Sequence, residues 1–176
     1  MKILIGFEES QAVCKAFRKL GHDAFSCDLQ ECSGGHPEWH MKCDIFAAIH
    51  DREWDLIILQ PPCTYTALCG NRWYYNSDLR REGILLCYRA WQAACNVCER
   101  VVLEQPKTIM QKHLGPKSQV IHPWQFGHGE TKETWLWIKG VPHLEPTDIV
   151  EGRENRIWKM SPSADRGKLR SKTYPG

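Results

Sequence analysis

The sequence predicts a single α/β domain built on an open, doubly wound and mostly parallel sheet. Two observations lead to this prediction. Apolar runs of strand length alternate along the chain with stretches of helical periodicity, and acidic or cysteine side chains follow several of these runs directly. With 176 residues, of which 42% are hydrophobic, the chain can bury one core but is short for two ordinary domains.

The opening of the chain predicts a strand, a helix and a second strand. Residues 2–6 are a short apolar run, and apolar side chains then recur at helical spacing over residues 9–20, until Gly21 ends the helix. Residues 23–28 indicate a second strand that ends in an acid. The intervening loop, residues 7–9, is therefore expected at the carboxyl end of the first strand.

The next predicted strand leads to a cysteine. Residues 31–40 are rich in glycine, histidine and cysteine and are expected to form a loop. Residues 55–59 form a continuous apolar run, typical of a strand buried on both faces. Pro61 and Pro62 prevent further ladder pairing, so Cys63 is expected just beyond the carboxyl end of this strand.

The second half predicts one long helix and three strands. Residues 78–98 have helical periodicity, and residues 100–104 indicate a strand that ends before Pro106. Residues 120–126 and 134–138 indicate two more strands, which a turn at Gly127-His128-Gly129 would pair antiparallel.

The composition excludes a membrane span. No apolar run approaches the roughly 20 residues that a bilayer requires, and the first residues lack the apolar core of an export signal. We therefore expect a soluble, cytoplasmic protein, in a host cytoplasm if it is encoded by a phage. Its nine cysteines are expected to be reduced thiols.

Charge divides the chain at about residue 150. Residues 151–176 hold seven lysines and arginines and three acids, against 16 and 18 in residues 1–150. We expect residues 1–150 to form the catalytic domain and residues 151–176 to form a basic tail. That tail either tracks phosphates or is a solvated end.

Four side chains that could take part in a reaction follow predicted strands. These are Glu8, Asp28, Cys63 and Glu104. Because the carboxyl ends of parallel strands meet at one edge of a sheet, all four are expected to face one crevice. A thiol and a carboxyl group on neighbouring strands can act on one ring, since the thiol adds to carbon while the acid assists at a ring nitrogen.

The order of these motifs resembles that of the DNA cytosine-C5 methyltransferases, in particular short phage-encoded members that lack a target-recognition domain. The resemblance covers most of residues 1–140. It is carried by Pro61-Pro62-Cys63, Glu104-Gln105-Pro106, Ile5-Gly6-Phe7-Glu8, Asp28, Asp44-Ile45, and the segment from Phe126-Gly127 to Trp135-Leu136.

The resemblance implies a Rossmann-like fold, S-adenosylmethionine as cofactor and covalent catalysis on a pyrimidine. Cys63 would attack C6, Glu104 would stabilise the charge developing at N3, and C5 would then accept a methyl or related alkyl group. Lys132 would supply one of the family's two cationic contacts, while Thr134 stands at the position of the other. The residues expected at the cofactor are Gly6, Phe7, Glu8, Asp28, Leu29, Asp44, Ile45, Gln60 and Pro61.

The expected substrate is cytosine in DNA, presented as an extruded or single-stranded base. About 40 residues after Ile138 are too few for a recognition domain, so sequence-specific reading of duplex DNA is not expected. Two alternatives remain open: the same chemistry on a free pyrimidine nucleotide, and a catalytically silent DNA-binding module. The resemblance implies a final helix that closes the cofactor pocket, which we expect from a second copy, from a partner subunit or from further C-terminal residues.

Two further features, a group of cysteines and histidines and one tryptophan, could be either functional or structural. Cys27, Cys32, His36, His40 and Cys43 form a zinc-like cluster, but their irregular spacing predicts no metal site. Trp73, which follows the Cys63 loop, belongs either to a base-stacking surface or to the core.

Overall fold

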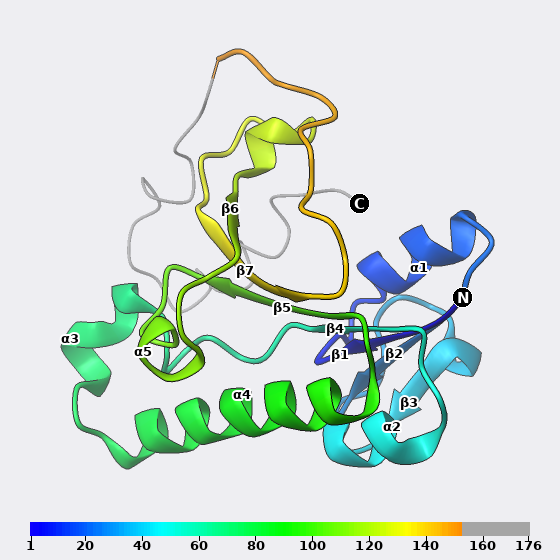
Figure 1. Cartoon of the computed structure of the whole chain (residues 1–176), viewed down its shortest axis with the longest axis horizontal. Helices are drawn as coiled ribbons and strands as arrows, with labels where there is room; N and C mark the ends of the chain where they lie inside the picture. Colours follow the sequence, from blue (N-terminus) through cyan, green and yellow to red (C-terminus); the bar gives the residue numbers. More distant parts are fainter. Residues whose placement is uncertain (153–176) are drawn as a thin grey trace.

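The computed structural model describes residues 1–152, and Figure 1 gives the element labels. Seven strands form one sheet in the order β3-β2-β1-β4-β5-β7-β6. Pairing is parallel from β3 to β5 and antiparallel where β7 joins β5 and β6. The strands are β1 (Lys2–Gly6), β2 (Asp23–Asp28), β3 (His40–Lys42), β4 (Leu56–Leu59), β5 (Val101–Pro106), β6 (Gln119–Ile121) and β7 (Thr134–Lys139).

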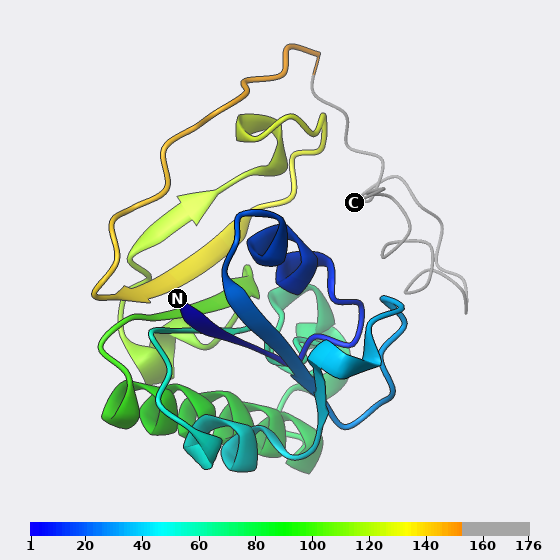
Figure 2. The ribbon, with the colours of Figure 1, turned by 90° about the vertical axis from the view of Figure 1, so that its right-hand side faces the viewer.

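Helices cover both faces of the sheet, so the doubly wound α/β prediction is confirmed. In Figures 1 and 2, α1 lies on one face, while α2 and α4 run along the other. The helices are α1 (Ala12–Lys19), α2 (Ile45–Asp51), α3 (Asn71–Tyr74), α4 (Asp78–Val97) and α5 (Gln111–Leu114), with 3₁₀ turns η1 (Pro37–Trp39), η2 (Leu68–Gly70) and η3 (Pro123–Gln125).

The two faces carry cores of different size. On the α4 face, Ile57 and Leu59 of β4 pack with the small residues Ala90 and Ala94 of α4 and with Trp137 of β7. On the α1 face, a smaller cluster consists of Ile3, Ile5, Cys14, Ala24 and Leu56. Because β4 buries residues on both faces, its sequence is apolar throughout, as parallel strands covered on both sides require.

Several boundaries differ from the sequence-based expectation. The first helix begins at Ala12 rather than at residue 9, because Gln11 has a left-handed backbone, with φ of 58°, that interrupts the helix there. Strand β3 was not predicted, because a three-residue strand has no periodicity of its own and forms by pairing with β2. Helix α2 was not predicted either, and Asp44 is its N-cap.

The antiparallel strands also differ in length from the prediction. β5 continues through Pro106, which is paired with Thr134 of β7 at the end of the ladder. β6 ends at Ile121 instead of residue 126, because His122 and Pro123 begin the η3 turn. The expected antiparallel pairing of β6 with β7 is present, and Figure 2 shows this pair rising beyond the parallel strands.

None of the helices in residues 1–152 has the length and apolarity needed to cross a bilayer. All nine cysteines lie in this range and are free thiols. The basic tail expected at residues 151–176 lies outside the described residues, apart from its first two.

Candidate active site

The strand register brings the expected site residues to one edge. Gly6 of β1 is level with Cys27 of β2 and with Leu59 of β4, and Leu59 is level with Leu103 of β5. The residues that directly follow these four therefore form a row along the carboxyl edge of the sheet. That row consists of Phe7, Asp28, Gln60 and Glu104.

The turn after β1 is held together by the Glu8 carboxylate. Its two oxygens accept hydrogen bonds from the backbone N–H groups of Val13 (2.6 Å) and Cys14 (3.1 Å), in the first turn of α1. Burial raises the pKa of Glu8, and these two hydrogen bonds oppose the shift. Glu8 therefore caps α1 from a buried position and shapes the turn.

Two residues of this turn have strained backbone conformations. Phe7 and Gln11 both have positive φ values, 65° and 58°, which are uncommon for residues other than glycine. Gly6 is required by packing, since a Cβ atom there would lie 2.4 Å from Cδ1 of Ile45. Strain of this kind often marks a functional site.

A buried glutamine holds the glycine-rich loop against this turn, a role that the sequence analysis missed. The Gln11 side chain donates to the His36 carbonyl oxygen (2.8 Å) and accepts from the His36 N–H (3.0 Å). Gly34 lies so close that a Cβ atom there would be 2.5 Å from Cβ of Gln11. Residues 33–36 are thereby fixed beside the carboxyl edge of β1 and β2.

The expected adenosyl-binding acids have different environments. Asp28 is partly exposed, and its Oδ1 accepts one hydrogen bond, from the Gln30 N–H (3.0 Å). Asp44 is the N-cap of α2 and accepts from the Phe46 N–H (2.8 Å). Leu29 is exposed, whereas Ile45 is buried against Gly6.

The Cys63 loop is clamped from β5 by Gln105, another residue that the sequence analysis did not assign. The buried Gln105 side chain donates to the Pro61 carbonyl oxygen (2.5 Å) and accepts from the Thr66 hydroxyl group (3.0 Å). The Cys63 carbonyl oxygen in turn accepts from the N–H groups of Thr66 and Ala67. Both sides of the Cys63 loop are therefore tied to the strand that carries Glu104.

A thiol, a carboxyl group and an ammonium group converge beyond β4 and β5. Burial raises the pKa of Cys63, the Glu104 carboxylate raises it further, and the Lys132 ammonium lowers it. Burial also raises the pKa of Glu104, and Lys132 again opposes the shift. Cys63 is therefore a neutral thiol in the free protein, and Glu104 holds its proton to higher pH than an exposed glutamate.

The zinc-like cluster does not converge. Cys27 Sγ lies 4.0 Å from Cys43 Sγ, and burial raises the pKa of Cys27 to about 12. His40 instead bonds Ser26 and the Gln30 carbonyl oxygen, and His36 stacks on Trp39. Within residues 1–152, no three Cys, His, Asp or Glu side chains are grouped to hold a metal ion.

No protein-family model and no curated protein matches the sequence. Two solved structures are similar in fold. A prophage-encoded E. coli protein described as a DNA modification methyltransferase is 13% identical with a TM-score of 0.57, over 92% of this chain and 55% of that one. The Dnmt2 methyltransferase of S. pombe is 14% identical with a TM-score of 0.53, over 93% of this chain and 56% of that one.

This chain thus spans just over half the length of either neighbour. At such low identity the likeness concerns the fold. The seven-stranded mixed sheet and these neighbours together identify an α/β fold of the S-adenosylmethionine-dependent methyltransferase type, as the sequence predicted.

Proposed function

We propose that the protein transfers a methyl or related alkyl group from S-adenosylmethionine to C5 of a pyrimidine, through a covalent adduct between Cys63 and C6, with cytosine in DNA as the substrate. The observation that carries this proposal is the convergence of Cys63, Glu104 and Lys132 at the ends of the adjacent strands β4 and β5. The names of the two fold neighbours, both methyltransferases, support it.

Glu104 activates the ring. A cytosine becomes electrophilic at C6 when N3 receives a proton or a strong hydrogen bond. Burial raises the pKa of Glu104, which favours the protonated carboxyl group that this step needs. The acid then stabilises the negative charge that would otherwise build up at N3.

Cys63 is the nucleophile. The thiol passes its proton to a solvent water, its sulfur forms a bond to C6, and the C5–C6 π electrons become available at C5. Lys132 favours this step because it lowers the pKa of Cys63 and offsets part of the penalty from burial and Glu104. After C5 is alkylated, a base removes the C5 proton, the C6–sulfur bond breaks and the ring regains its double bond.

The cofactor would lie along the tips of β1 and β2. Asp28 fits the ribose, because its partly exposed carboxylate accepts only one hydrogen bond within residues 1–152 and retains acceptor capacity for two hydroxyl groups. Phe7 offers apolar contact at the tip of β1, and Ile45 supports Gly6 from a buried position. Gln60 and Pro61 lie at the neighbouring strand tip. When bound, S-adenosylmethionine supplies an electrophilic methyl group.

Within this proposal Glu8 acts through the shape of the loop. Its two oxygens already receive hydrogen bonds from α1, and the N-terminal turn of that helix is therefore occupied by a carboxylate of the protein itself. Asp44 and Leu29 would line the adenine side, since Asp44 caps α2 two residues beyond the Asp28–Lys42 pair.

A mechanism-based trap tests the proposal. The protein is incubated with isotope-labelled S-adenosylmethionine and with DNA or deoxycytidine monophosphate that carries fluorine at C5. Because fluorine cannot leave as a proton does, the methylated adduct should persist and appear by mass spectrometry on the peptide that contains Cys63. Unfluorinated substrates should be turned over, and the mass of the product identifies the alkyl group.

The matched control is Cys63→Ser, which should bind S-adenosylmethionine but form neither adduct nor product, because a serine alkoxide is not available at neutral pH. An active wild-type protein that forms no adduct, or a Cys63→Ser variant with the wild-type rate, would falsify the proposed mechanism.

A further inference from the structure

Two exposed aromatic side chains stand beside the Cys63 loop. Trp73 and Tyr75, in and just after α3, expose 73% and 71% of their surface, while Tyr74 between them is partly buried. The structure thus decides between the two readings of Trp73, since it is not a core residue. Large aromatic rings exposed in this way offer flat apolar faces on which a ligand can stack.

The turn that carries these rings is firmly anchored to the nucleophile loop. The Tyr74 ring packs edge-on against Tyr65, two residues after Cys63, with ring centroids 4.9 Å apart. Arg80 of α4 donates to the Tyr65 carbonyl oxygen (2.9 Å) and to Oδ1 of Asn71 (2.5 Å). The four-residue helix α3 is therefore held in place by tertiary contacts, and it presents its outward rings at a set position relative to Cys63.

One cation contacts an exposed ring, and two more lie on neighbouring segments. The Arg72 guanidinium group lies 5.0 Å from the centre of the Trp73 ring. The Lys107 carbonyl oxygen accepts a hydrogen bond from the Leu68 N–H (2.9 Å), at the start of η2. The Lys107 side chain is exposed, and its Nζ lies 4.0 Å from Oε2 of Glu133. Lys132, also exposed, acts on Cys63. The nearest acid on α4, Asp78, is paired with Arg81 (2.6 Å).

We propose that Trp73 and Tyr75 form a stacking platform that holds single-stranded DNA next to Cys63, with Arg72, Lys107 and Lys132 facing its phosphates. Aromatic faces together with cations are the combination that binds single strands without sequence preference. A duplex keeps its base faces stacked on one another, so it presents a base to this platform only after the cost of extruding that base has been met. The inference rests on the proposed function, because it names the polymer that brings the pyrimidine to Cys63.

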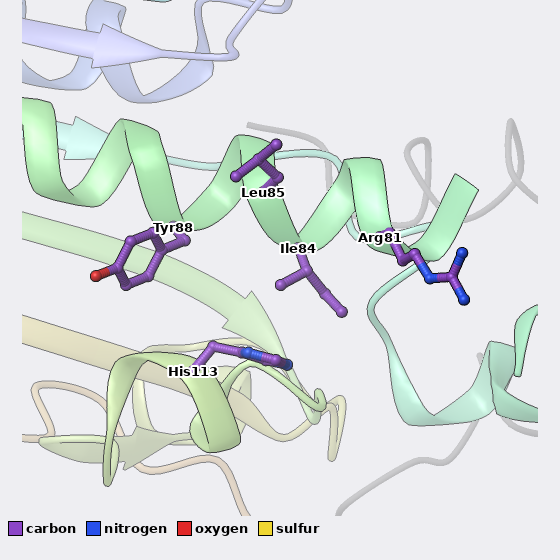
Figure 3. Close-up of a pocket in the computed structure, with 5 residues that line it drawn as sticks. All are labelled: Arg81, Ile84, Leu85, Tyr88 and His113. Atoms are coloured by element: carbon purple, nitrogen blue, oxygen red, sulfur yellow. The ribbon is translucent and has the colours of Figure 1, made fainter. Parts of the chain in front are cut away.

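A second exposed surface provides a matched control. Figure 3 shows a groove between α4 and α5 lined by Arg81, Ile84, Leu85, Tyr88 and His113. Tyr88 is 42% exposed there, but it lies on α4, away from the anchored turn. Replacement of Tyr88 removes an exposed aromatic ring without altering the platform.

The test measures the fluorescence anisotropy of short labelled DNA, single-stranded or hairpin duplex, with wild-type protein, Trp73→Ala, Tyr75→Ala, Trp73→Phe and Tyr88→Ala. Loss of one stacked base should weaken single-strand binding by about 5- to 100-fold in the two platform alanine variants. Trp73→Phe, which keeps a ring, should retain most of the affinity, and Tyr88→Ala should match wild type. Thermal melting checks that each variant is folded.

Two outcomes would overturn the platform. One is equal single-strand affinity for Trp73→Ala and Tyr88→Ala, and the other is a duplex affinity as high as that for the single strand. Sedimentation of the wild type and Trp73→Ala identifies the competing explanation, in which the rings bury against a second copy of the chain. Because the assay needs no turnover, failure of methyl transfer and failure of the platform are separate results.

Discussion

The two halves of the sheet edge use their charged groups differently. At the tips of β1 and β3, Glu8 and Asp44 accept hydrogen bonds from helix N-termini, so their charges stabilise the loops around them. At the tips of β4 and β5, the Glu104 carboxyl group accepts no hydrogen bond within residues 1–152, and the Cys63 thiol bonds with its own backbone. Burial raises both pKa values. In the first half the carboxylates hold the loops in place. In the second half the thiol and the carboxyl group remain free to contact a ligand.

This difference indicates which carboxyl group, Glu8 or Glu104, is the better candidate for the acid of the proposed reaction. Glu8 and Glu104 both follow apolar strands, and burial raises the pKa of each. Only Glu8 has backbone donors that favour its charged form and bind both of its oxygens. Glu104 instead lies near a thiol and an ammonium group, and no backbone donor fixes its charged form. It is therefore the better candidate to exchange a proton with a bound substrate.

The largest effect is expected for Glu104→Gln. Loss of the proton donor should slow turnover by about 10²-fold or more. Because the folded pKa of Glu104 is raised, its proton is lost, and wild-type turnover should fall, as pH rises through that folded value. Ionisation of the buried acid should also reduce folding stability over the interval above its ordinary pKa of 4.5.

Pre-steady-state rates against pH, together with denaturant unfolding at the same pH values, measure both effects. The descending limb of the rate profile that belongs to Glu104 should be absent from the Glu104→Gln variant, whose stability should also vary less over this interval. A variant with the wild-type rate and the wild-type profile would remove Glu104 from the reaction.

The next effect concerns the other half of the edge. Asp28→Ala should weaken S-adenosylmethionine binding by about 1–3 kcal/mol, the usual cost of removing a charged hydrogen-bond partner. Stability should change little, because Asp28 accepts only one local hydrogen bond within residues 1–152, from Gln30. Calorimetry with Asp51→Ala as a surface control checks this, and unchanged affinity would exclude Asp28 from the cofactor site.

The smallest effect is expected for Glu8→Ala. Removal of the cap should lower the free energy of unfolding by about 0.5–2 kcal/mol, while the turnover rate at saturating cofactor should remain within a few-fold of wild type. Urea unfolding and steady-state kinetics measure the two quantities. A Glu8→Ala variant that is as stable as wild type but inactive would reverse the assignment of the two carboxylates.

Local signals in the sequence determined most of the parallel sheet and the positions of the candidate site residues along the chain. Continuous apolar runs predicted β1 and β4, because a strand covered on both faces must be apolar throughout. Prolines after β4 predicted that Cys63 would follow a strand end, since proline cannot continue the ladder. These properties depend on a few neighbouring residues, so a single sequence contains them.

Tertiary contacts decided what each of those residues does. The sequence could not distinguish Glu8 as a helix cap from Glu104 as an unpaired acid, because hydrogen-bond partners depend on how the chain folds back. The same holds for Gln105, whose side chain reaches Pro61 and Thr66 some 40 residues away in the sequence. It holds for Trp73 as well, which is exposed because Tyr65 and Arg80 fix the turn with the neighbouring Tyr74 inward.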